Sequence, residues 1–227
     1  MLTLSRSLRP TRYGEDVSAS AYHHGHLRDA LVGAAVEAVR ENGPDGWSLR
    51  DLCRRVGVSH NAAYRHFADR DELVSVVSEL TMRRLVEALD LRLASVGEDD
   101  PVLRARRRLA EVGRGYVAFA LEEPHLFRLA FRSTAVTELS PSPESDPYGV
   151  LSQALDDLVD VGYLAPSVRP GAEMTCWSAV HGFAILSLDG PLRTIGDAER
   201  DAALDDVLAA IDRSYAATTG AQIGRWA

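Results

Sequence analysis

Residues 48–67, SLRDLCRRVGVSHNAAYRHF, decide the fold of the N-terminal part of this chain. The apolar side chains of Leu49, Leu52 and Val56 recur at intervals of three and four, which predicts one apolar face on a short helix. Gly57 follows, and glycine readily takes the positive φ that a tight turn needs. The stretch therefore predicts a first short helix that ends in a tight turn.

A second short helix is expected after the turn. Ser48 can cap the first helix and Ser59 the second, because a serine hydroxyl accepts a hydrogen bond from a backbone N–H of the first turn. Ala63 and Phe67 are four residues apart and are expected to turn inward. The residues left facing outward are then His60, Asn61, Tyr64 and Arg65. Two short helices around a tight turn, the second carrying groups that bind phosphates and base edges, are the layout of a DNA-binding helix-turn-helix.

The alternative for this segment is a plain helical hairpin whose arginines are only solvated. Residues 48–70 hold five Arg against two Asp, inside a protein of net charge −8. A local excess of positive charge in an acidic protein favours DNA recognition over simple solvation. We therefore predict a recognition helix here.

The composition is that of an ordinary globular protein, with 46% hydrophobic and 26% charged residues in a chain of 227. No apolar run approaches the roughly 20 residues of a membrane span, and residues 1–20 lack the apolar core of a signal peptide. Cys53 and Cys176 lie in apolar helical patterns, as expected of buried thiols in a reducing compartment. These features predict a cytoplasmic protein without a membrane partner.

Charge is unevenly distributed along the chain. Residues 1–90 carry 12 Arg and 13 acidic residues, whereas residues 91–227 carry 13 Arg and 20 acidic residues. DNA would repel the acidic C-terminal part, so the distribution favours a DNA-facing module followed by a separate module.

Helical patterns run nearly throughout the chain, and no strand alternation of useful length appears. Asp69 is expected to cap a long helix, and Pro170 to occupy the first position of a later one. The expected helices span about 25–41, 69–94, 101–122, 148–162, 170–188 and 197–217, with a short aromatic helix after Pro124 and a turn-rich segment at 133–147.

The helix-turn-helix resembles the DNA-binding domain of TetR-family transcriptional regulators. The family motif has a Ser or Thr cap, a Gly-Val-Ser turn, a short helix ending in Tyr-x-His-Phe, then a basic residue and a leucine. The matching positions are Ser48-Leu49, Leu52-Cys53, Gly57-Val58-Ser59, Tyr64-Arg65-His66-Phe67, Arg70 and Leu73. Cys53 stands where the family usually has alanine, and Arg70 stands where lysine is more usual, which keeps the charge.

This resemblance implies an all-α protein with an N-terminal three-helix helix-turn-helix domain and a C-terminal helical bundle for ligand binding and dimerisation. The expected divisions are a flexible arm at 1–21, the DNA-binding domain at 22–75 and the regulatory and dimerisation domain at 76–227.

The resemblance also implies which side chains meet double-stranded operator DNA. Contacts to phosphates are expected from Ser48, Tyr64, His66 and Arg70. Base edges are expected to face His60, Asn61 and Ala62, and asparagine is suited to bidentate contact with adenine. Arg65 could serve either role, and Ser59 belongs to the site as the cap of the recognition helix.

The segment WSAVHG at 177–182 resembles the W-x-x-x-H-G motif of one C-terminal domain type in this family. The last two long helices of such regulators usually pair with their two-fold mates. Applied here, helices at about 170–188 and 197–217 form a homodimer, with Val207 and Ile211 on the contacting face and Gly182 allowing close helix approach. A two-fold dimer is physically sensible because one short recognition helix reads too few bases.

Aromatic side chains gather in the C-terminal part and form a candidate effector site. A bundle core with several aromatic and a few polar groups can hold a small molecule, although any single aromatic is more often plain core. The cavity is expected within residues 101–188, lined by some of Tyr116, Phe119, Phe127, Phe131, Trp177 and His181. The competing interpretation is a filled core.

Other chemistry is weakly supported. His23, His24 and His26 could bind a transition metal, but no Cys or carboxylate cluster lies nearby, and a role at the helix start near phosphate is favoured. No nucleophile elbow and no HExxH pattern appears. We therefore expect no enzyme, no cofactor and no metal.

The sequence predicts a homodimeric, sequence-specific DNA-binding transcriptional regulator, and favours a repressor that an unidentified small apolar effector releases from its operator. An activator or a constitutive regulator stays open. The alternative from another class is a helical small-molecule-binding or enzymatic protein with a coincidental hairpin. Only the regulator is expected to bind DNA with an affinity that falls steeply with salt.

Overall fold

The computed structural model describes residues 17–132 and 146–216, with side chains from His26 onward. All regular structure in these ranges is helical, so the predicted all-α fold is confirmed. The elements are α1 (Val17–Asn42), α2 (Leu49–Val56), α3 (His60–Ala63), α4 (Arg70–Ala94), α5 (Pro101–Glu122), α6 (Pro124–Arg132), α7 (Pro147–Asp160), α8 (Ala172–Leu188), the 3-10 helix η3 (Pro191–Thr194) and α9 (Asp197–Ala216).

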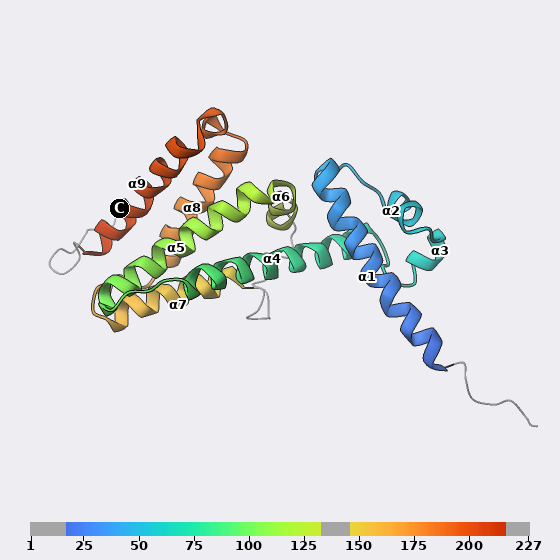
Figure 1. Cartoon of the computed structure of the whole chain (residues 1–227), viewed down its shortest axis with the longest axis horizontal. Coiled ribbons are helices and arrows are strands. Elements are labelled where there is room, and N and C mark those ends of the chain that lie inside the picture. Colours follow the sequence, from blue (N-terminus) through green and yellow to red (C-terminus); the bar gives the residue numbers. More distant parts are fainter. Residues whose placement is uncertain (1–16, 133–145, 217–227) are drawn as a thin grey trace, which may run out of the picture.

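The helices form two groups that share α4. Figure 1 shows α1, α2 and α3 together at one end of the molecule and α5, α7, α8 and α9 at the other. The long helix α4 runs from the first group beneath the second, and α6 lies between the two groups. Close contacts join α4 to α1, α5, α6 and α7. No helix in the described ranges combines the length and the apolar character that a membrane crossing needs.

The helix-turn-helix forms as its sequence predicts. The Ser48 hydroxyl accepts a hydrogen bond from the Asp51 backbone N–H at 3.2 Å, and the Ser59 hydroxyl accepts one from the Ala62 N–H at 3.3 Å. Gly57 ends α2 with φ of +76°, a conformation that glycine adopts without the Cβ clash other residues incur. These caps satisfy backbone donors that a short helix cannot satisfy internally.

The remaining helix boundaries follow the sequence with two corrections. Asp69 caps α4 as predicted, accepting from the Glu72 N–H at 2.8 Å. Helix α1 begins at Val17 instead of residue 25, inside the range expected to be an arm. The added segment lacks the apolar periodicity on which the predicted start depended, but it contains no proline to interrupt a helix. Residues 1–16 and 133–145, which hold most of that arm and most of the turn-rich segment, lie outside the described residues.

The second correction concerns the start of α8. Pro170 does not occupy the first helical position, because Gly171 takes φ of +87° and α8 begins only at Ala172. Gly182, which was expected to allow close helix approach in the dimer, borders open space within this chain, since a Cβ there would meet nothing within 4 Å. The close approaches are at Gly113 and Gly115 of α5, where a Cβ would lie 2.6 Å from Leu208 Cδ2 and 2.8 Å from Leu89 Cδ2 respectively.

Candidate DNA-binding surface and bundle cavity

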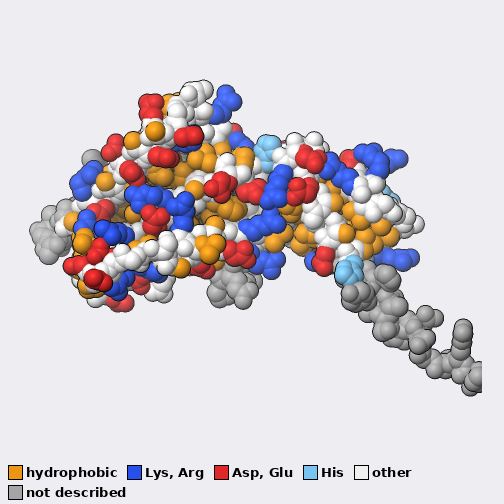
Figure 2. Space-filling view, in the orientation of Figure 1, with side chains coloured by type: hydrophobic (Ala, Val, Ile, Leu, Met, Phe, Trp, Pro, Cys, Tyr) orange, Lys and Arg blue, Asp and Glu red, His pale blue; other side chains and the backbone are white. Residues whose placement is uncertain are grey.

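The outer face of α3 presents the side chains that the sequence assigns to DNA. His60, Asn61 and Arg65 are exposed, Tyr64 is half exposed, and Ala62 and His66 are partly covered. Ala63 and Phe67 are buried, so the predicted inward and outward pattern is confirmed. The rings of His60 and Tyr64 meet edge to face with centroids 5.2 Å apart. Figure 2 shows arginine side chains gathered over α2 and α3 at this end of the molecule.

Ser48 lies at the same surface but is engaged within the chain. Its hydroxyl donates to Asp51 Oδ2 at 2.6 Å while it caps α2. This hydrogen bond is the main reason that the pKa of Asp51 lies below its usual range. A phosphate contact by Ser48 would therefore have to replace its bond to the carboxylate.

Arg70 has a structural task that the sequence did not reveal. Its Nη2 donates to the Pro44 carbonyl oxygen at 2.6 Å, and its guanidinium lies 4.4 Å from the centroid of the Trp47 ring. The side chain is partly covered, and Trp47 is buried in the N-terminal core. Arg70 thus links the loop between α1 and α2 to the start of α4. This structural role is independent of any contact with DNA.

Arg54 is a surface cation that the sequence analysis passed over. Its side chain is 78% exposed, and its Nη2 lies 3.0 Å from Asp51 Oδ1 in an i,i+3 pair on α2. The signal was available, because Arg50 and Arg54 are four residues apart and fall on the polar face opposite Leu49 and Leu52. Arg54 is a further candidate for a phosphate contact.

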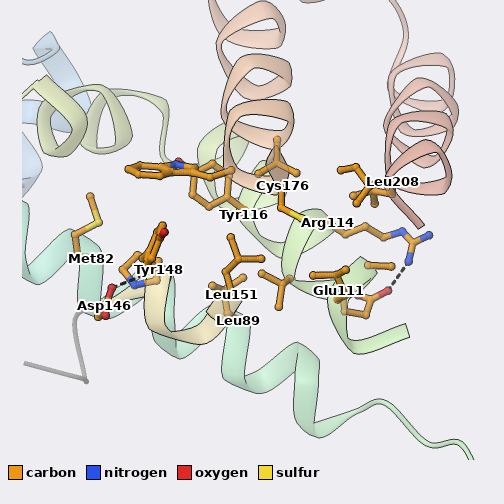
Figure 3. A pocket seen from close by; sticks show the side chains of 18 of the residues that line it. Met82, Leu89, Glu111, Arg114, Tyr116, Asp146, Tyr148, Leu151, Cys176 and Leu208 are labelled. Carbon is orange, nitrogen blue, oxygen red and sulfur yellow. Dashed lines mark hydrogen bonds and ion pairs between the residues drawn. The ribbon is translucent and has the colours of Figure 1, made fainter. Parts of the chain in front are cut away.

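A cavity of about 1090 Å³ lies in the C-terminal bundle, between helices α4 to α9. Figure 3 shows Met82, Asp146 and Tyr148 grouped toward one end and Glu111, Arg114 and Leu208 toward the other. The cavity therefore extends well beyond residues 101–188, since α4 and α9 also contribute walls. The sequence predicted the cavity within residues 101–188, because helical periodicity does not show which neighbouring helix closes a cavity.

The structure brings three of the six predicted aromatic-site residues to the cavity wall. Tyr116, Phe131 and Trp177 line it. Phe119, Phe127 and His181 are not among the lining residues; the rings of Phe119 and Phe127 are buried in the bundle core. The lining residues that sequence reasoning missed include Ser78, Glu79 and Met82 of α4, Asp146 and Tyr148 of α7, and Cys176 of α8.

Three of these aromatic residues share a hydrogen-bonded chain. Trp177 Nε1 donates to the Tyr116 hydroxyl at 3.3 Å, and that hydroxyl shares a second hydrogen bond with His181 Nδ1 at 2.9 Å, whose direction depends on the histidine tautomer. Burial raises the pKa of Tyr116 and lowers the pKa of His181, which favours a neutral hydroxyl and a neutral imidazole. His181 therefore helps to fix the position of Tyr116, and the indole N–H of Trp177 is already used in this chain.

Metal binding finds no support within the described residues, where no group of three or more His, Cys, Asp or Glu side chains comes together. His23 and His24 lie in α1, but before the first described side chain.

Replacing Arg70 by Ala should lower the free energy of unfolding by about 2 kcal/mol, because a charged hydrogen bond and a cation–π contact are lost together. Thermal and urea melts of the full chain would measure this. Arg54→Ala is the matched control and should change stability by less than about 0.5 kcal/mol, as usual for an exposed pair. Equal stability of the two variants would contradict the structural role of Arg70.

Replacing Phe127 by Ala should cost about 3–5 kcal/mol of unfolding free energy, because the ring is fully buried in the bundle core. Phe131→Ala should cost clearly less, since that ring already borders the cavity and is only partly buried. Urea denaturation of both variants makes the comparison. Similar losses of unfolding free energy would show that the Phe131 ring contributes as much to core packing as the Phe127 ring.

Known proteins share both halves of this architecture. Residues 31–77 match the family model for bacterial regulatory proteins of the tetR family, and residues 109–211 match the tetracyclin repressor-like C-terminal domain. The uncharacterized HTH-type transcriptional regulator YobS of Bacillus subtilis (strain 168) is 26% identical over 162 residues, which cover 71% of this chain and 79% of YobS.

Solved structures agree with the sequence matches. A protein with unknown function from Rhodococcus sp. RHA1 is 27% identical and superposes with a TM-score of 0.70, covering 86% of this chain and 98% of that one. A TetR variant from Acinetobacter baumannii AYE in complex with minocycline is 19% identical with a TM-score of 0.57, covering 87% and 99% of the two chains, and so shares the fold. Both domain models belong to one family and together span more than half of the residues, so this chain belongs to the TetR family of DNA-binding transcriptional regulators.

Proposed function

We propose that this TetR-family regulator is a homodimeric repressor, and that a small and largely apolar molecule bound in the bundle cavity releases it from its operator. The observation that carries the proposal is that one short helix, α6, belongs to the core of the DNA-binding group and to the wall of the cavity at once. We further propose that the protein acts in the cytoplasm and without catalysis, as a regulator of transcription would.

On DNA, α3 would lie in the major groove with its exposed face against the bases. Asn61 stands in the first turn of α3, where a recognition helix makes its base contacts. Its amide can pair with the N6 and N7 edge of an adenine. His60 and Ala62 would flank it toward the bases, and Tyr64, His66 and the cap Ser48 would face phosphates. Arg65 is exposed, which suits either role.

The homodimer would form through α8 and α9. Helix α8 exposes Met174, Ile185 and Leu186, with relative exposures of 57%, 37% and 46%. Gly182 is open on the same helix and would let a second copy approach closely. Val207 and Ile211 of α9 are less suitable test positions than the sequence suggested, because both pack against cores of their own chain.

Helix α6 would carry the signal from ligand to DNA. Leu126 and Leu129 are buried in the same core as α1, α2 and Phe67, whereas Phe127 and Ala130 are buried in the bundle core. Phe131, at the end of α6, lines the cavity. We infer that a ligand which displaces Phe131 acts on α6, whose movement would disturb the packing of α1.

Polar contacts also hold α6 and the preceding residue, Glu123, to α1 and the loop that follows it. Glu123 binds the Arg40 guanidinium through both carboxylate oxygens, with Arg40 Nε 2.9 Å from Oε2. His125 Nδ1 donates to the Arg40 carbonyl oxygen at 2.9 Å, and Arg132 Nη1 lies 2.8 Å from Asp45 Oδ2. Such contacts are of limited strength at a surface, but together they fix the orientation of the two groups.

Release then needs only a shift in population between two arrangements of these groups. The ligand would bind better to the arrangement in which the recognition helices of the dimer no longer match successive major grooves, about 34–36 Å apart. The size of the effect equals the difference between the ligand's affinities for the two arrangements.

Asn61→Ala should relax base preference at one operator position, at a cost on the order of 1–3 kcal/mol for the preferred sequence. An operator selected from random duplexes and its single-base variants would be titrated by fluorescence anisotropy. Arg54→Ala should instead weaken all variants alike and lower the salt slope by about one. If Asn61→Ala weakens every variant equally, Asn61 does not read a base.

Leu186→Asp should split the dimer and abolish operator binding, because one buried carboxylate on each copy would be desolvated without a partner. Sedimentation velocity at micromolar concentration measures the assembly, and circular dichroism checks that the bundle stays folded. Leu91→Asp, at a leucine of α4 with 76% exposure, is the matched control and should remain dimeric. A monomeric parent protein would refute the dimer.

A further inference from the structure

The two ends of the cavity differ in how their charges are compensated. At the α9 end, each lining arginine already has a carboxylate partner: Arg106 with Asp212 at 2.5 Å, Arg107 with Glu98 at 2.8 Å, and Arg114 with both Glu111 and Asp205 at 2.8 Å. These cations are neutralised by the protein itself. A ligand at that end would gain little from their charge.

The opposite end, which we call the acidic end, is formed by Ser78, Glu79 and Met82 of α4, Asp146 and Tyr148 of α7, and Trp177 of α8. Asp146 caps α7 by accepting from the Tyr148 N–H at 3.0 Å through Oδ1, which leaves its other oxygen facing Gly149. Within the described part of the chain, neither Glu79 nor Asp146 forms an ion pair. The lining residues that α4, α6, α7 and α8 contribute contain no cation, and Arg83 and Arg84 of α4 are not among them.

Aromatic rings surround the same space. Tyr148 and Trp177 meet edge to face with centroids 5.7 Å apart, and Tyr116 and Phe131 do so at 6.0 Å. The polar atoms of Tyr116 and Trp177 are already bonded to one another and to His181, so these residues offer a ligand their ring faces and edges. An aromatic face attracts a cation by its quadrupole, most strongly where water is excluded.

Ser78 independently indicates a ligand. Its side chain is 1% exposed and its Oγ has no hydrogen-bond partner among the described residues, although it lies in the wall of the cavity. A buried hydroxyl without a partner is unfavourable and rare in folded proteins. It stands one helical turn before Met82 on the same face of α4, and so faces the acidic end.

We propose that the acidic end of the cavity binds a lipophilic cation, an ammonium or phosphonium centre with apolar substituents. The carboxylates of Glu79 and Asp146 supply the negative potential, the rings supply cation–π contacts and apolar area, and Ser78 accepts from any N–H of the ligand. An anionic ligand would instead meet two carboxylates and no unpaired cation. The inference rests on the proposed effector site and specifies the charge of its ligand.

The decisive comparison uses two ions of one shape and opposite charge, tetraphenylphosphonium and tetraphenylborate, titrated into the full-length protein by calorimetry. The phosphonium should bind at least about tenfold more tightly than the borate, about 1.4 kcal/mol in binding free energy. The double variant Glu79→Gln, Asp146→Asn should remove most of that preference, and asparagine still caps α7. Glu87→Gln, an exposed acid of α4 outside the cavity, should leave it unchanged.

A second pair of probes tests Ser78. Ser78→Ala should weaken the binding of 3,3-diphenylpropylammonium several-fold and leave the binding of its N-trimethyl derivative unchanged, because only the former has N–H donors. If Ser78→Ala changes the affinity for neither amine, Ser78 does not contact the ligand.

Release of operator DNA is measured separately, so that the two ideas fail separately. Tighter binding of the borate with release of DNA overturns the cation site and leaves the effector function standing. Binding of the phosphonium without release of DNA supports the cation site and refutes release by this cavity. Binding of neither ion overturns the cation site.

Discussion

The placement of α6 is the constraint on which the rest of this molecule depends. Nine residues, from Pro124 to Arg132, carry apolar side chains on both sides of the helix. Leu126 and Leu129 complete the core of the DNA-binding group, and Phe127 and Ala130 complete the core of the bundle. Because buried side chains pack densely, neither core can rearrange without α6. The two groups are therefore coupled twice, once by the long helix α4 and once by α6.

Internal pairing decides which polar groups are available for function. Arg70 is a natural candidate for a phosphate contact, but its guanidinium binds the Pro44 carbonyl oxygen and lies over the Trp47 ring. Tyr116 and Trp177, natural donors to a ligand, bond to one another. What stays available on the DNA side is the exposed face of α3, and in the cavity the carboxylates and Ser78 of the acidic end. Groups that are not already paired within the chain are therefore the better candidates for binding DNA or a ligand.

The cavity and the DNA surface also differ in how each is built. The DNA surface comes from a short run of consecutive residues, held by Ser48, Gly57 and Ser59 through local hydrogen bonds and one positive φ. The cavity is assembled from six helices, and its lining residues run from Glu72 of α4 to Asp212 of α9. Close approach at Gly113, against Leu208 of α9, sets part of its shape.

That difference separates the features that local sequence patterns predict from those that they do not. The helix caps, the turn at Gly57, the inward side chains Ala63 and Phe67, and most helix boundaries depend on neighbours within a few residues, so local patterns predicted them. The tasks of Arg70 and His181, the burial of Phe127 away from the cavity wall, and the contribution of α4 to that wall depend on contacts between distant helices. Periodicity indicates which face of a helix is buried but not which other helix covers it, because that depends on how distant helices pack together.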